Sequence, residues 1–168
     1  SVRLVSGIHE LLPNRAGGRA IQKNLEILGD INYTKDELDF AYQIQEATMK
    51  PKLGIDGKIK PLRETLENPG GGSTDVGDVS YIVPVVRMGA TTAPIGTPWH
   101  SWAVVACGGM SIGHKGMMQA AKALSMTMVD MFTNPKLIDE VKEEFKTRKG
   151  EYIYNGMVPD GPPPIGQQ

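Results

Sequence analysis

Two short stretches of the sequence carry residues that could take part in chemistry. Residues 70–78 read GGGSTDVGD, and residues 96–102 read GTPWHSW. Consecutive glycines let backbone amides approach a ligand closely, and small hydroxyl and carboxylate side chains add donors and acceptors. The turn lacks the Gly-Lys-Ser/Thr ending of a Walker loop and the spacing of a dinucleotide-binding fingerprint. By itself, such a turn is more often structural than functional.

His100 is the residue in these stretches best suited to bind a metal ion. It lies next to Trp99 and close to Trp102, and a neutral imidazole held by packing is a good zinc ligand. The alternative, which is commoner for an isolated histidine, is a ring satisfied by a backbone carbonyl. Asp75 and Asp78 could bind a cation, orient a ligating imidazole or cap the next element. The pattern leaves these alternatives open.

The other histidines and the single cysteine are expected to be structural. His9 lies on a predicted first strand, and His114 opens a predicted helix, where the dipole disfavours a positive charge. The amides at that helix start are a weak candidate for carboxylate binding. Cys107 excludes an internal disulfide, fits a reducing compartment and has no base nearby in sequence, so we do not assign it as a nucleophile.

The order of predicted elements indicates an α/β fold, because helices alternate with buried strands. Helical periodicity and capping signals predict four helices, over residues 18–28, 34–48, 115–133 and 137–148. Runs of β-branched and apolar residues predict buried strands over 79–89 and 103–110. Residues 49–72 lack periodicity, and a loop of that length is usually functional or mobile.

Composition restricts the class of protein. The 168 residues suit one domain, and a net charge of −1 without a basic cluster argues against nucleic acid as a partner. No apolar run approaches the about 20 residues needed to span a bilayer, and no signal-peptide pattern is present. We therefore expect a cytoplasmic protein with no membrane partner. The strand-like start at Ser1 fits either the loss of upstream sequence or a domain edge.

The combination of motifs resembles the last third of the co-catalytic zinc peptidases, the family of carboxypeptidase G, aminoacylase and related amidohydrolases. In that family a glycine-rich turn is followed by a late metal-ligand histidine, as GGGSTDV is followed here by WHSW. The likeness is greatest to the branch of the aminobenzoyl-glutamate utilisation proteins. It covers nearly the whole chain and rests on the segments SGIHELLPN, GSTDVGDVSYIVP, TPWHSW and GHKGMMQAAKALSMT and on the proline-rich end.

This resemblance implies a division of the chain and a set of site residues. Residues 1–13 would end a lid or dimerisation domain, 14–150 would form the C-terminal portion of a three-layer αβα catalytic domain, and 151–168 would be a Pro/Gly-rich tail. His100 would bind one of two zinc (or manganese) ions. The residues implied to line the substrate pocket are Gly71, Gly72, Ser73, Thr74, Asp75 and Asp78, the last of which belongs to this branch's own version of the turn.

The function implied is that of part of a metal-dependent amidohydrolase cleaving N-acyl amino acids or dipeptide-like amides of the aroyl-glutamate type. The family's other ligands and its water-activating glutamate come from an N-terminal half whose motifs are not matched here. We assign no catalytic residue, and we expect the chain alone to be inactive and not to retain the ions. We expect a small-molecule substrate and, at full length, a homo- or hetero-oligomer. The alternatives are a non-catalytic partner or regulatory module sharing the fold and, more weakly, a domain whose glycine turn binds a carboxylate.

Overall fold

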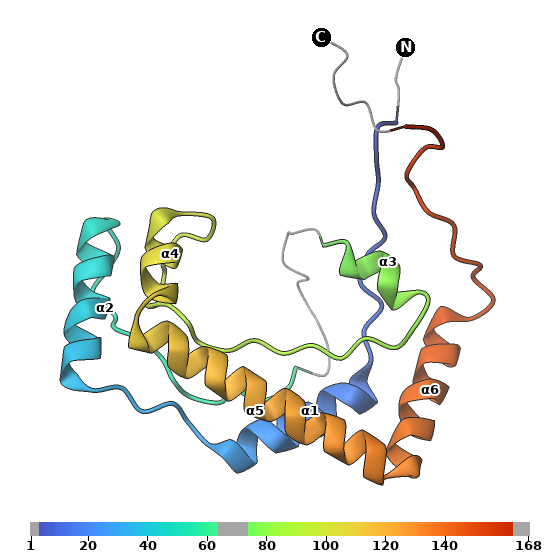
Figure 1. The fold of residues 1–168 in the computed structure, drawn as a ribbon, viewed down its shortest axis with the longest axis horizontal. Helices are drawn as coiled ribbons and strands as arrows, with labels where there is room; N and C mark the ends of the chain where they lie inside the picture. The colour runs from blue at the N-terminus through green and yellow to red at the C-terminus, as the bar shows by residue number, and fades with distance from the viewer. Residues whose placement is uncertain (1–3, 64–73, 163–168) are drawn as a thin grey trace.

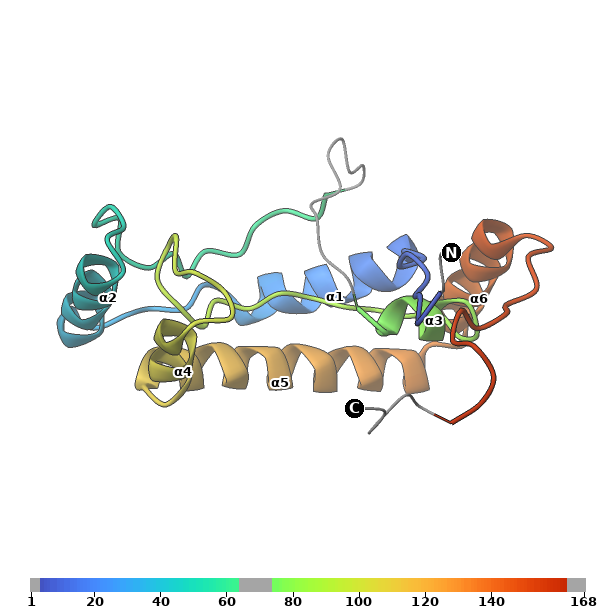
Figure 2. The same cartoon turned by 90° about the horizontal axis from the view of Figure 1, so that it is seen from above.

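The computed structural model describes residues 4–63 and 74–162, and in these ranges the chain forms six helices. They are α1 (Arg15–Leu28), α2 (Lys35–Ala47), α3 (Val76–Ser80), α4 (Trp102–Gly108), α5 (Ser111–Thr133) and α6 (Pro135–Lys149). The long helix α5 contacts α1, α4 and α6 (Figure 1). Helix α1 runs beside it, α6 follows at one end, and α2 and α4 lie at the other (Figure 2).

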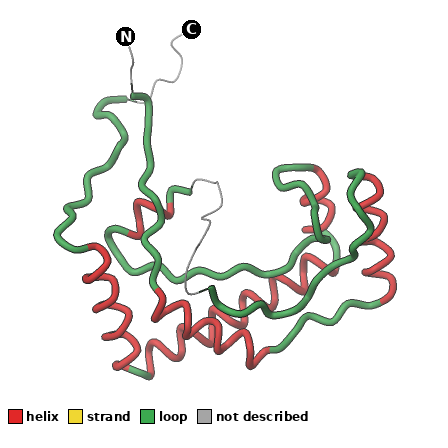
Figure 3. The backbone as a smooth tube through the Cα atoms, turned by 180° about the vertical axis from the view of Figure 1, so that it is seen from behind, coloured by secondary structure: helices red, strands yellow, loops and turns green. Residues whose placement is uncertain are grey.

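The predicted α/β fold is wrong for the described residues, which contain no strand (Figure 3). The predicted strand 79–89 begins inside α3 and continues as an extended segment. A strand needs a neighbour to complete its backbone hydrogen bonds, and no described segment pairs with residues 84–91. Pro84, moreover, has no N–H to donate. Residues 4–13, where a final lid-domain strand was expected, are also not a strand in the structure.

The second predicted strand, 103–110, is helical. Residues 103–108 lie in α4, and the amide of Gly109 donates to the carbonyl of Val105 at 3.2 Å. The β-branched pair Val104 and Val105 favours a strand only weakly, and contacts made by the folded chain override such a preference. Cys107 therefore lies on a short helix, where it is fully buried.

The predicted helices are confirmed, with small differences at their ends. Helix α1 begins earlier than predicted because the side chain of Asn14 accepts a hydrogen bond from the amide of Gly17. The predicted capping box of α2 is present, with both Thr34 and Glu37 in their expected roles. Helix α5 begins at Ser111, four residues before the predicted start.

Two small apolar clusters hold the helices together. The first joins α2, α4 and α5 through Ile44, Ala103, Cys107 and Ile112. At Gly113 a Cβ would overlap the carbonyl of Cys107, so this glycine permits the tight corner between α4 and α5. The second cluster joins α1 to α5 through Ile21, Leu25 and Ala123, with Val86 and Met88 of the extended segment packed against it.

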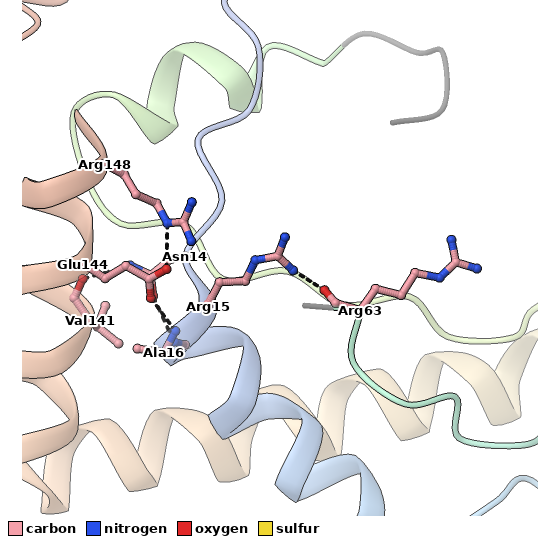
Figure 4. Close-up of polar contacts among 8 residues, drawn as sticks. Asn14, Arg15, Ala16, Arg63, Val141, Glu144 and Arg148 are labelled. Carbon is pink, nitrogen blue, oxygen red and sulfur yellow. Dashed lines mark hydrogen bonds and ion pairs between the residues drawn. The ribbon is translucent and has the colours of Figure 1, made fainter. Parts of the chain in front are cut away.

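Polar contacts fix α6 against the start of α1 (Figure 4). The Asn14 side chain donates to the carbonyl of Val141 at 2.8 Å. A carboxylate oxygen of Glu144 accepts from the amide of Ala16 at 2.6 Å, which satisfies one of the amides left free at a helix N-terminus. Because Asn14 also caps α1, the same side chain sets both the start of that helix and its contact with α6.

A row of apolar side chains on α5 is left uncovered. Leu124, Met128 and Phe132 are all exposed, although the helix is apolar over much of its length. None of the helices in the described part of the chain is long and apolar enough to cross a membrane.

Candidate functional site

His100 lies in the loop just before α4 and is exposed. Its ring makes no hydrogen bond or ion pair with the described residues. The side chains of Trp99 and Trp102 are 69% and 59% exposed, so they do not hold the imidazole by packing within this chain. The ring is therefore neither sealed in the core nor satisfied by a backbone carbonyl among the described residues.

The backbone at His100 is unusual because its φ is 61°, in the left-handed region. A residue other than glycine reaches this region at an energetic cost, and such residues are found more often at functional sites than elsewhere. The loop is fixed on its C-terminal side, where the hydroxyl of Ser101 donates to the carbonyl of Pro98 at 2.6 Å. The exposed His100 therefore lies on a loop whose backbone is strained and held by a hydrogen bond.

Only the end of the glycine-rich turn can be located. Gly71, Gly72 and Ser73 lie outside the described residues. Thr74 is half-buried, and its hydroxyl accepts from the amide of Val76 at 3.3 Å. Asp75 is exposed at the position preceding α3, and its side chain does not cap the helix. Whether these residues contact a substrate remains a prediction.

Asp78 contacts the side chain of His9, a residue that the sequence led us to expect to be structural. Its carboxylate oxygen lies 2.7 Å from Nδ1 of His9, whose Nε2 lies 2.8 Å from the hydroxyl of Tyr152. The hydrogen bond from His9 lowers the pKa of Asp78, and Tyr154 contributes in the same direction. The signal in the sequence was the aromatic pair in EYIYNG, but nothing in the pattern connected it to His9.

The two predicted parts of the site are separated in the structure. Helix α3, which follows the glycine-rich turn, lies toward one end of α5, and α4, which follows His100, lies at the other (Figures 1 and 2). Residues 81–100, which contain turns as well as extended backbone, connect them. The described chain thus does not bring His100 together with Asp78.

The described residues do not form a metal centre. Within residues 4–63 and 74–162, no group of three or more His, Cys, Asp or Glu side chains is placed to hold an ion. A zinc centre needs three or four protein ligands, and a two-metal centre needs more. His100 would supply one nitrogen donor, so the donors found among the described residues do not fit a complete centre. No step of a reaction is therefore assigned through a metal.

A groove of about 430 Å³ lies between α1 and the segments 57–63 and 87–91. Four cationic residues line it, namely Lys58, Lys60, Arg63 and Arg87. The described residues that line it include amides, such as Gln22 and Gln119, but no carboxylate. Lys60 is already paired with Asp56 at 3.4 Å, and the other three cations in this concave surface attract anions, so the groove is suited to an acidic ligand.

Comparison with known proteins agrees with the motif resemblance. Similar proteins include a subunit of the p-aminobenzoyl-glutamate hydrolase of Escherichia coli (strain K12), which is 33% identical over 172 residues. That match covers 88% of this chain and 36% of the bacterial protein. The Xaa-Arg dipeptidase of Homo sapiens is 29% identical over 64% of this chain and 24% of its own length. The Mus musculus enzyme of the same name is 34% identical over 48% of this chain and 18% of its own length.

The chain thus spans little more than a third, at most, of the length of the curated relatives that it matches. No family model matches the sequence. No solved structure matches it either. The relatives are named as hydrolases or dipeptidases, and the first match extends over most of this chain. The resemblance predicted from the sequence is therefore confirmed, and this chain is a partial homologue of the bacterial p-aminobenzoyl-glutamate hydrolase subunit, with similarity to the Xaa-Arg dipeptidases over a smaller part of its length.

Proposed function

We propose that this chain forms part of a metal-dependent amidohydrolase that cleaves N-acyl amino acids or dipeptide-like amides, with an aroyl-glutamate as the preferred type. The observation that carries this proposal is the 33% identity over 88% of the chain to a hydrolase subunit named for p-aminobenzoyl-glutamate. In the complete protein, His100 contributes one ligand to a zinc (or manganese) centre whose other ligands lie outside this chain. Thr74 and Asp75 line the substrate pocket.

The groove beside α1 supports an acidic rather than a basic substrate. Lys58, Arg63 and Arg87 favour a ligand with carboxylates, such as the glutamyl part of p-aminobenzoyl-glutamate, whereas Lys60 is paired with Asp56. The same cations would repel the guanidinium group of an Xaa-Arg dipeptide. The proposed substrate is therefore of the type named for the bacterial relative rather than the type named for the mammalian ones.

A second candidate function is that of a non-catalytic partner or regulatory module, alone or in a homo- or hetero-oligomer. It is supported by the name of the bacterial relative, which describes one subunit of a hydrolase. On this hypothesis the chain keeps the fold and the contacts with other subunits, while the chemistry takes place on a different polypeptide.

The two functions are distinguished by replacing His100→Ala in the complete protein, with His114→Ala as the matched control. His114 is exposed on the first turn of α5, so its loss should change neither stability nor chemistry. Hydrolysis of p-aminobenzoyl-glutamate and bound metal are measured together. We expect His100→Ala to lower kcat/KM by about 100-fold or more and to reduce the bound metal, because loss of even an outer-shell partner costs about 10–100-fold. Full activity and full metal content in that variant would refute the role of His100.

A further inference from the structure

His9 joins three parts of the chain that are far apart in the sequence. Its side chain is 6% exposed, and its ring nitrogens contact Asp78 and Tyr152, which lie 69 and 143 residues away. The ring also packs against Tyr81 and Tyr154, with centroids 5.2 Å apart in each pair. Such a buried and fully contacted imidazole is held in a single orientation.

The hydrogen bonds define which nitrogen of His9 carries the proton. The carboxylate of Asp78 can only accept, so Nδ1 of His9 donates to it. In the neutral ring Nε2 then accepts from the hydroxyl of Tyr152. Both nitrogens are satisfied, and neither is free to act on a substrate. The His9 ring therefore orients the side chains that it contacts and does not take part in a reaction.

Helix α3 depends on these contacts because it is too short to be stable without them. It has five residues and no side-chain cap, and a helix of one turn is unstable alone. At Gly77 a Cβ would overlap the carbonyl oxygen of His9, so the two backbones lie in direct contact. The hydroxyl of Ser80 accepts from the amide of Leu12 at 2.8 Å. The segment from His9 to Leu12 and helix α3 therefore form one unit.

The end of the glycine-rich turn is attached to this unit. The amide of Gly77 donates to the carbonyl of Thr74, and the amide of Asp78 donates to that of Asp75, both at 3.1 Å. From this chain of contacts we infer that His9 is a positioning residue, which fixes Thr74 and Asp75 through Asp78 and α3. The inference rests on the proposed function, in which these two residues line the substrate pocket.

The test compares three variants of the complete protein. His9→Phe keeps an aromatic ring for packing but removes both polar contacts, and His9→Asn keeps a donor close to the position of Nδ1. His114→Phe is the control. Amide hydrogen exchange is followed over residues 74–83, and KM and kcat are measured with p-aminobenzoyl-glutamate. For His9→Phe we expect exchange about tenfold faster in that segment, as the loss of the one hydrogen bond from His9 to α3 implies, and a KM raised several-fold with kcat nearly unchanged.

His9→Asn should recover most of the wild-type values, and His114→Phe should not change them. Unchanged exchange and unchanged KM in His9→Phe would overturn the inference. Faster exchange with an unchanged KM would support the hold of His9 on α3 while counting against the glycine turn as part of the substrate pocket. If His9→Phe exchanges faster throughout α1 and α5, it has lost its fold, and Asp78→Ala, which removes the same hydrogen bond from its other side, then decides. Faster exchange confined to residues 74–83 in Asp78→Ala supports the inference, and no change there overturns it.

Discussion

The ion pair between Glu37 and Lys115 gives the sharpest prediction about stability. Glu37 is 6% exposed on α2, and one carboxylate oxygen accepts from Nζ of Lys115 at 2.6 Å and from the amide of Thr34 at 2.7 Å. Replacement by glutamine keeps the capping box, because the amide oxygen still accepts from Thr34. Glu37→Gln therefore removes the charge while leaving the helix start intact.

The size of the effect follows from the pKa of Glu37. Burial alone would raise it, but hydrogen bonds from Lys115, Ser111 and the backbone of Thr34 outweigh burial and lower the pKa from 4.5 to about 2. A shift of that size corresponds to an upper limit of about 3 kcal/mol. The Lys115 side chain is 35% exposed, so solvent screens the pair, and we expect about 1–2 kcal/mol at neutral pH. The pKa of Glu37 is lower in the folded state than in the unfolded state. This stabilisation is therefore complete above about pH 4.5 and is lost as the pH falls towards 2.

The assay is urea unfolding of the wild type and Glu37→Gln, each with and without Lys115→Met, at pH values between 7 and 3. We expect the cost of Glu37→Gln to be about 1–2 kcal/mol at pH 7, to shrink with acid and to disappear when Lys115 is already methionine. Glu140→Gln is the control, since its pair with Lys136 is exposed with a 4.0 Å separation and should cost less than about 0.5 kcal/mol. A cost that is independent of pH, or one that persists with Lys115→Met, would refute the reasoning.

Two further predictions concern the groove and the contact between α1 and α5. Arg87→Gln should raise KM for p-aminobenzoyl-glutamate several-fold, because it removes one cation from the groove. The control Lys136→Gln, on α6, should leave KM unchanged. An equal change of KM in both variants would show that the groove does not bind the substrate. Asn24→Ala should lower the free energy of unfolding by about 2–3 kcal/mol, because its buried amide donates to Thr127 at 3.0 Å and to Asp130 at 2.7 Å. Thermal unfolding checks this value, with the exposed Lys23→Ala as control, and a loss below about 0.5 kcal/mol, the limit expected for a neutral surface change, would contradict it.

The helices were predictable because their signals are local. The Thr34 and Glu37 capping box and the Asn134-Pro135 boundary each lie within a few residues of the helix end that they define. The strands were not predictable in the same way, because a strand exists only with a partner. Residues 84–91 have a strand-like sequence and an extended backbone, but no described segment pairs with them.

The residue types of the candidate site were proposed from a family resemblance, whereas its connections could not be predicted from the sequence. The relatives confirm the family resemblance, and the roles that it implies for His100 and Asp75 stay predictions. It treated His9 as an isolated strand residue, since its contacts with Asp78 and Tyr152 span 69 and 143 residues. Contacts over such separations are set by how α3 and the C-terminal segment pack, and no local pattern encodes them.

Cys107 makes the corner between α4 and α5 open to chemical measurement. It is the only cysteine in the sequence, it is fully buried in the α4–α5 corner, and burial raises the pKa of its thiol. A maleimide can reach and alkylate the thiol only when α4 separates from α5. The labelling rate therefore reports how often this local opening occurs. Because α4 begins two residues after His100, any molecule that immobilises the loop carrying His100 would slow the labelling, and the native thiol would report binding without an engineered cysteine.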